Sequence, residues 1–284
     1  MLTPTYTKQY KKLNPEQKQA VDTTEGPVMV IAGPGTGKTQ ILTLRIANIL
    51  LSSQTNPENI LALTFSESAA FQMRQRLTEI IGTPGFRVEI STFHSFGNSI
   101  IQNFPEEFDN LLAAESIIEA EQIELIEEII KKTDLKLLKP WGEPLFYVRD
   151  SLQAINDLKK ESITSEGLKT AIEKKQANFV SLGDLYHKKG KYQGQMKGKY
   201  QDELKVIEKL KEFVKIYESY QNSLLDNKKY DFNDMLIEVI KVLEKNKSLL
   251  LQLQEKYQYI LVDEHQDTNS SQNRLVELIS GFYE

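Results

Sequence analysis

The chain has 284 residues and a mass of 32.6 kDa, which is enough for about two ordinary domains with full hydrophobic cores. Its 40% hydrophobic and 26% charged residues exclude a disordered chain, and no apolar stretch reaches the roughly 18 residues of a membrane span. The net charge of −5 argues only weakly against binding to phosphate polymers, while the absence of cysteine excludes disulfides and thiolate zinc sites. Because residues 1–12 carry no secretion signal, we expect a cytoplasmic protein without membrane contact.

The first hundred residues alternate short apolar runs with longer helical stretches, a pattern typical of a parallel α/β sheet. We expect strands at residues 28–32 (VMVIA), 60–65 (ILALTF) and 88–92 (VEIST), each bounded by Gly, Pro or hydroxyl residues. A helix is expected over residues 68–81, with Gly82 as its C-terminal stop. These elements form a strand, helix, strand unit.

The second hundred residues change in character. Residues 106–130 hold nine carboxylates and no lysine or arginine, and their apolar positions predict an amphipathic helix with an acidic face. Residues 186–200 hold five lysines, three tyrosines and no acid, so they are either a nucleic-acid contact or a solvated loop. Helical periodicity returns over residues 202–220, and residues 257–264 predict a buried strand that ends in acids. The last strand is expected to rejoin the first sheet.

A glycine-rich loop, AGPGTGKT, occupies residues 32–39 between an expected strand and an expected helix. Glycines let successive backbone N–H groups converge on phosphate oxygens, and the helix N-terminus adds a positive dipole. Lys38 would reach the terminal phosphates and Thr39 would offer a hydroxyl to magnesium. The sequence therefore predicts a nucleotide site made by Gly33, Pro34, Gly35, Thr36, Gly37, Lys38 and Thr39.

Hydrolysis also needs an acid for the metal and a base for the attacking water. The run ILVDEHQD at residues 260–267 places Asp263 at the end of an apolar strand and Glu264 beside it. Taken alone, two adjacent carboxylates are equally consistent with an ordinary acidic turn. Together with the phosphate loop on one sheet, they indicate Asp263 as the metal ligand and Glu264 as the base.

Six motifs in this order and spacing resemble those of the UvrD, Rep and PcrA helicases of superfamily one. The motifs are LNPEQKQAV from Leu13, AGPGTGKT from Ala32, LALTFSESAA from Leu61, STFHSF from Ser91, YDFNDM from Tyr230 and VDEHQDTN from Val262. The resemblance implies a RecA-like P-loop ATPase sheet flanked by helices, with an inserted all-α subdomain. The domains expected are residues 1–104 and 229–284 for the two parts of the ATPase domain and 105–228 for the insertion. It also implies ATP and magnesium as cofactors and 3′ to 5′ movement along single-stranded DNA with separation of duplexes.

The resemblance assigns further residues at the nucleotide. Gln17 resembles the glutamine that reads adenine, although alone it would pass for a solvated surface residue. Lys38 and Glu264 would be catalytic with Asp263, and Gln266 falls where the family couples nucleotide state to DNA. Gln40 follows the loop and is also expected to line the nucleotide site, at a position where the bacterial enzymes usually have an arginine.

The resemblance also places Thr64, Phe65, Thr92, Phe93 and His94 along a track for single-stranded DNA. Phe65 would meet a base, because aromatic stacking is worth roughly 1 to 3 kcal/mol per base. From the sequence alone, Phe65 and Phe93 could also be buried core residues.

Other positions depart from the family pattern. Glu67 and Ser68 replace an Asn-Lys pair beside this track, and His265 replaces an aromatic residue. These departures predict weaker or retuned DNA contact and leave the hydrolytic residues intact.

The chain ends at Glu284, before the next helicase motif, so we expect a truncated chain that lacks the second RecA-like domain. Such a fragment would bind nucleotide, hydrolyse it very slowly and not unwind DNA. Two alternatives remain: the N-terminal part of a RecB- or AddA-like helicase-nuclease, and a nucleic-acid-binding module with a vestigial ATP site. A P-loop kinase or GTPase is disfavoured, because the acid motif is DEHQD and no Asn-Lys-x-Asp is present.

Overall fold

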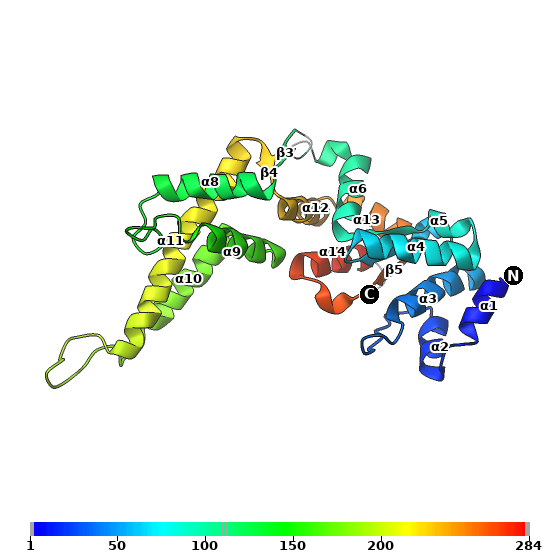
Figure 1. Cartoon of the computed structure of the whole chain (residues 1–284), viewed down its shortest axis with the longest axis horizontal. Helices are drawn as coiled ribbons and strands as arrows, with labels where there is room; N and C mark the ends of the chain where they lie inside the picture. The colour runs from blue at the N-terminus through cyan, green and yellow to red at the C-terminus, as the bar shows by residue number, and fades with distance from the viewer. Residues whose placement is uncertain (1–2, 109–110, 112, 282–284) are drawn as a thin grey trace. The chain divides into compact units, whose positions relative to one another are not determined.

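The structure is a computed structural model that describes residues 3–108, 111 and 113–281. The chain divides into two compact units, which are described separately (Figure 1). Unit 1 comprises Met1–Glu107 and Glu238–Glu284, and unit 2 comprises Phe108–Ile237. The second unit therefore begins and ends somewhat later than the insertion of residues 105–228 expected from the sequence.

Unit 1 is built on a three-stranded parallel sheet, with β1 (Ile60–Thr64) between β2 (Glu89–Thr92) and β5 (Tyr259–Val262). Leu61 of β1 is in register with Glu89, and Ile60 is in register with Tyr259. All five residues of β1 are buried, as expected for a central parallel strand covered on both faces. The prediction that the last strand rejoins the first sheet is confirmed, and so is the α/β class.

The strand expected at residues 28–32 is not formed in the structure. Val28, Met29, Val30 and Ile31 are exposed, with 91% of Ile31 accessible, and no backbone hydrogen bond joins them to another described segment. An apolar run permits a strand but does not ensure one. A strand also needs a neighbouring segment that pairs with its backbone N–H and C=O groups. The expected four-stranded sheet is therefore corrected to a sheet of three strands among the described residues of unit 1.

Two helices pack on one face of this sheet. They are α3 (Lys38–Ser52) and α4 (Glu67–Ile81), whose apolar residues share a core cluster with Ile60, Ala62 and Leu261. The Ser66 side chain caps α4 by accepting from the backbone N–H of Ala69, and the helix ends at Gly82 as predicted.

Shorter elements complete unit 1. They are α1 (Pro4–Tyr10), α2 (Pro15–Asp22), η1 (Pro57–Asn59), α5 (Pro84–Arg87), α6 (Phe93–Asn103), η2 (Pro105–Glu107), α13 (Lys247–Lys256), η3 (His265–Asp267) and α14 (Ser270–Ser280). Among the described residues, no helix is both long enough and apolar enough to cross a membrane.

Unit 2 is mainly helical (Figure 1). Its elements are β3 (Glu115–Ser116), α8 (Glu119–Lys132), α9 (Val148–Lys160), α10 (Ser165–Val180), α11 (Gly198–Asp226) and β4 (Lys229–Tyr230), followed by the start of α12 (Phe232–Lys245). The acidic helix expected over residues 106–130 is shorter than predicted, because Glu115–Ser116 pairs with β4 as a short strand and the helix begins only at Glu119. Residues 109, 110 and 112 of that range lie outside the described residues.

A buried ionic cluster joins three segments of unit 2. The Lys159 ammonium is fully buried and contacts Asp231 at 2.5 Å and Asp234 at 2.7 Å. Tyr220 of α11 donates its hydroxyl to Asp231, and Asp231 in turn accepts from the first backbone N–H groups of α12. The YDFNDM motif therefore supplies both a helix cap and the counter-charges of a buried lysine.

Candidate active site

The phosphate loop lies at the N-terminus of α3. Gly37 is the N-cap of that helix and has φ of 85°, a left-handed conformation that residues with a Cβ rarely adopt. The Thr36 hydroxyl donates to the carbonyl of Gly33 at 2.7 Å, which closes the turn. Residues 33–36 are exposed, so the loop is open to a ligand.

Gln17 of α2 forms a hydrogen bond to the phosphate loop. Its amide nitrogen donates to the carbonyl of Thr36 at 3.1 Å, and its amide oxygen accepts from the backbone N–H of Asn14 at 3.0 Å. Asn14 caps α2 in a reciprocal capping box with Gln17. Both ends of the amide are thus in use in this structure, so reading adenine would require an exchange of these bonds; that role stays a prediction.

Asp263 follows β5 and lies beside the start of α3. Its carboxylate accepts a hydrogen bond of 3.0 Å from the Thr39 hydroxyl, and the residue is only 7% exposed. Burial raises the pKa of Asp263 above its ordinary value, and the hydrogen bond from Thr39 opposes that shift. Burying a carboxylate that has no cation in contact costs free energy, so this position favours the binding of a positively charged ligand.

Lys38 and Glu264 face each other across the same site. The Lys38 Nζ lies 3.5 Å from the Glu264 Oε2, and the same carboxylate accepts from the side-chain amide of Gln266. Glu264 has φ of 50°, one of the three residues other than glycine with positive φ in the described chain. Such backbone strain persists where the surroundings hold it, and it commonly marks functional positions.

The site offers oxygen ligands suited to magnesium. Thr39 and Asp263 provide a hydroxyl and a buried carboxylate side by side, the hard donors that this ion prefers. Among the described residues, no group of three or more His, Asp or Glu side chains could hold an ion without help.

The five residues expected along a DNA track differ in exposure. Phe65 is 63% exposed directly after β1, whereas Thr64 and Phe93 are buried. In this structure those two side chains are packed at the strand ends, and of the two phenylalanines only Phe65 offers a ring to solvent; the roles of all five residues at DNA stay predictions. Thr92 is also buried and caps α6, and His94 is half-buried, with its pKa lowered to about 4 by burial.

Two hydroxyl groups near the ends of β1 and β2 donate to the carboxylate of Glu67. Glu67 accepts from the Thr92 hydroxyl at 2.9 Å and from the Ser95 hydroxyl at 2.5 Å. These bonds, first from Ser95 and then from Thr92, lower the pKa of Glu67. Ser95 was not among the predicted site residues, although its place three residues after the capping Thr92 is a sequence signal for it.

The two other departures lie at the nucleotide side. Gln40 is exposed on the first turn of α3, and His265 is exposed at the start of η3. The Nδ1 of His265 lies 3.4 Å from the Thr268 hydroxyl. Neither side chain adds a fixed positive charge to the loop.

Comparison with known proteins identifies relatives of this amino-acid sequence. A DNA helicase II homologue (described as probable) from Rickettsia conorii is 33% identical over 273 residues, which cover 95% of this chain and 36% of that protein. ATP-dependent DNA helicase PcrA from Staphylococcus aureus is 32% identical over 268 residues, 94% of this chain and 31% of the relative. PcrA of Staphylococcus epidermidis is also 32% identical, over 95% of this chain and 32% of its own length.

The chain thus spans about a third of the length of the curated relatives it matches. The model of the UvrD/REP helicase N-terminal domain matches residues 13–283. That range contains the loop of α3, the acids after β5 and the helical unit 2. The chain therefore belongs to the UvrD/REP helicase N-terminal domain family.

Proposed function

We propose that this chain is the N-terminal ATP-binding portion of an ATP-dependent DNA helicase that moves 3′ to 5′ on single-stranded DNA. One juxtaposition carries the proposal. Lys38 and Thr39 of the phosphate loop lie within 3.5 Å and 3.0 Å of Glu264 and Asp263, although more than two hundred residues separate the two pairs. A triphosphate bound to the loop would meet both the cation and the acids that its hydrolysis requires.

Nucleotide binding follows from the loop and from Lys38. In this structure the Lys38 ammonium is paired with Glu264 and only 24% of its side chain is exposed. The terminal phosphate of ATP would replace Glu264 as the counter-charge of Lys38, because a phosphate carries more charge and more acceptor oxygens than one carboxylate. This exchange leaves the Glu264 carboxylate free at the position where water would attack.

Hydrolysis is assigned to the acids after β5. Glu264 would take the proton of the attacking water, and Gln266, which donates to the same carboxylate, would set its orientation. Thr39 and Asp263 would hold magnesium, which when bound neutralises charge on the phosphates. The buried position of Asp263 suits this role, because its carboxylate has no cation within contact in the described chain.

Binding of DNA is assigned to the edge of the sheet where β1 and β2 end. Phe65 offers an exposed ring for an unpaired base, and the ends of parallel strands are the usual place for ligands in α/β sheets. Single-stranded and duplex DNA are the proposed partners, together with a second RecA-like domain. Translocation needs two domains that open and close on ATP. A second domain would also be the source of an arginine across the cleft, a contribution worth about 10³ to 10⁵ in rate in related phosphoryl-transfer enzymes.

The alternatives differ from this proposal in testable ways. A helicase-nuclease is not favoured, because the matched relatives are named helicases. A vestigial ATP site would keep nucleotide affinity and show no turnover that depends on Glu264. The 284-residue chain by itself is expected to bind nucleotide, turn it over slowly and leave duplexes unseparated.

The first experiment is a titration of the chain with a fluorescent ATP analogue in the presence of magnesium. We expect Lys38→Ala to weaken binding about tenfold or more, because a charge-assisted contact to phosphate is lost. Lys12→Ala, which removes an exposed lysine from unit 1, is the matched control and should bind as the wild type does. Equal affinities of wild type and Lys38→Ala would refute the proposed nucleotide site.

The second experiment separates turnover from binding. Glu264→Gln should keep nucleotide affinity close to that of the wild type while lowering ATP turnover about 10²- to 10⁴-fold, as expected for loss of a general base. Because the isolated chain turns over slowly, the measurement is best made on the full-length protein with and without single-stranded DNA. If the rate of ATP turnover changed neither on Glu264→Gln nor on addition of single-stranded DNA, the alternative of a vestigial ATP site would be favoured.

A further inference from the structure

The segment between α10 and α11 forms a small hairpin. It is called here the lysine hairpin and is defined as residues 186–200, which include the first three residues of α11. Tyr186 and Met196 form an antiparallel bridge, and the backbone of His187 bonds to Gln195 at 3.0 Å and to Gly194 at 2.9 Å. Leu185, just before the hairpin, is 7% exposed and packs with Met196 in a core cluster between α10 and α11. The base of the hairpin is therefore anchored, and Figure 1 shows its tip projecting beyond the ends of these two helices.

The tip concentrates positive charge that the described chain does not neutralise. Lys197 and Lys199 near the base pair with Asp184, at 3.5 Å in the case of Lys199. Lys188, Lys189 and Lys191 are exposed and make no ion pair within the described part of the chain. Three adjacent cations on a chain of net charge −5 mark a local surface for an anionic polymer.

Aromatic rings accompany these cations. Tyr186 is 50% exposed and Tyr192 is 54% exposed, so each keeps about half of its surface in water. The Lys191 ammonium lies 5.9 Å from the centre of the Tyr192 ring, and the ring of His187 lies 6.0 Å from that of Tyr192. Lysines for phosphates beside rings for bases are the combination by which proteins hold single-stranded nucleic acid.

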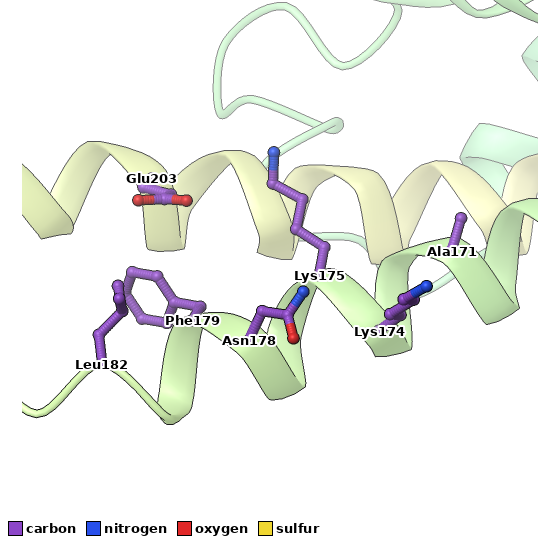
Figure 2. A pocket seen from close by; sticks show the side chains of 7 residues that line it. All are labelled: Ala171, Lys174, Lys175, Asn178, Phe179, Leu182 and Glu203. Carbon is purple, nitrogen blue, oxygen red and sulfur yellow. The ribbon is translucent and has the colours of Figure 1, made fainter.

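A nearby cavity has different chemistry. It measures about 430 Å³ and is lined by Ala171, Lys174, Lys175, Asn178, Phe179, Leu182 and Glu203 (Figure 2). Glu203 of α11 faces the cavity from the side opposite the lysines of α10, so a phosphate there would meet a carboxylate. Residues 186–200 contain no acid at all. The charge distribution thus favours the hairpin over the cavity as the place for an anionic polymer.

We infer that the tip of the lysine hairpin is a binding site for single-stranded DNA, separate from the strand ends at Phe65. This inference rests on the proposed function and adds to it a second contact, carried by unit 2. Lys188, Lys189 and Lys191 would neutralise phosphates, while Tyr186 and Tyr192 would stack on unpaired bases. An acidic protein partner would use the lysines equally well but would leave the two exposed rings without a role.

The test is fluorescence anisotropy of the 284-residue chain with a short labelled oligothymidylate over a series of salt concentrations. Replacing Lys188, Lys189 and Lys191 together by Ala should weaken binding about tenfold at low salt. It should also make the plot of log affinity against log salt shallower by about 2, because a single strand releases roughly 0.7 counterion per phosphate contact. The same replacement of Lys8, Lys11 and Lys12 in unit 1 is the matched control and should change neither quantity.

The rings are tested separately from the charges. Tyr186→Ala with Tyr192→Ala should weaken binding about fivefold or more at every salt concentration, leaving the salt slope unchanged. Replacing both tyrosines by Phe instead should leave binding as in the wild type, since Phe keeps the stacking surface. The affinity for a DNA duplex of equal length should be the same for the wild type, the Ala variant and the Phe variant. Circular dichroism melting verifies that each variant is folded.

The outcomes distinguish the inference from the proposed function. If binding falls on Phe65→Ala but ignores all hairpin variants, the hairpin site is refuted and the proposed function stands. A wild-type chain that binds no oligonucleotide at low salt would refute both. If the lysine variant loses affinity while the tyrosine variants bind normally, the surface is a general polyanion site and the single-strand assignment is wrong.

Discussion

The hydroxyl of Thr39 donates to the carboxylate of Asp263 over 3.0 Å, although 224 residues separate them in the chain. The contact joins the first turn of α3 to the end of β5. The Asp263 carboxylate is buried there without a cation in contact, and this burial raises the pKa of the group although the hydrogen bond from Thr39 opposes the shift. Stability and function are therefore opposed at this position, as they commonly are in active sites.

This opposition predicts that Asp263→Asn stabilises the chain in the absence of nucleotide and magnesium. The folded pKa of Asp263 lies above its value in the unfolded chain, so its contribution to stability is present below pH 3.8 and is lost as pH rises through the folded pKa. Asn keeps the acceptor for Thr39 without the charge, and we expect a gain of about 1 kcal/mol at neutral pH. Thermal melts over a pH series measure this. Asp267→Asn, an exposed neighbour, is the control, and a lower melting temperature for Asp263→Asn would contradict the argument.

Glu67 is expected to restrain DNA binding at the strand ends. Its carboxylate accepts hydrogen bonds from Thr92 and Ser95, and it carries a negative charge two residues along the chain from the exposed Phe65. Removing that charge in Glu67→Gln should raise the affinity for single-stranded DNA a few-fold at low salt, with a smaller gain at high salt because the effect is electrostatic. Glu79→Gln on the same helix is a matched control. An affinity that is unchanged or lower would show that Glu67 does not oppose DNA.

His94 should make unit 1 sensitive to mild acid. Burial lowers its pKa to about 4, so the stability it contributes is complete above the unfolded value near pH 6.5 and is lost as pH falls toward 4. The loss amounts to on the order of 3 kcal/mol as an upper value. Proton NMR of the imidazole against pH measures the titration directly, and denaturant unfolding at several pH values measures the stability. In His94→Gln the dependence between these pH values should flatten; a midpoint near 6.5 in the folded wild type would disprove the burial argument.

Lys159 should be essential to the fold of unit 2. Replacing it by Met leaves the buried carboxylate of Asp231 and the partly buried carboxylate of Asp234 without their cation, at a cost of about 3 to 5 kcal/mol. Lys160→Met, whose side chain is 45% exposed in the wild type, should cost less than about 1 kcal/mol. Combining Lys159→Met with Asp231→Asn should recover part of the loss, since Asn still caps α12. Denaturant melts of the wild type, Lys159→Met, Asp231→Asn and the double variant give the coupling, and equal losses for Lys159→Met and Lys160→Met would contradict the buried pair.

Much of the local structure could be predicted from neighbouring residues. The helix over residues 68–81 and its stop at Gly82 follow from short-range periodicity and capping, and both are present in the structure. The strand at residues 28–32 could not be decided this way. Its apolar residues fit a strand, but a strand exists only where another segment supplies its hydrogen bonds.

The sequence also could not predict which of two similar residues is buried. Phe65 and Phe93 both follow an apolar run, yet the first is 63% exposed and the second is 2% exposed. The difference arises because Phe93 begins α6 and turns into the core, whereas Phe65 leaves β1 toward solvent before Ser66 caps α4. Which side of an element faces the core depends on partners distant in the chain.

The amino-acid sequence alone determined which chemical groups are present and in what order: a glycine-rich loop with Lys38 and Thr39, and two acids after an apolar run. These are local properties, because turn geometry and strand ends depend on adjacent residues. Tertiary structure decided that Thr39 meets Asp263, that Lys38 is paired with Glu264 and that Glu67 holds Thr92. Such contacts depend on how distant strands align in one sheet, and no local pattern encodes that alignment.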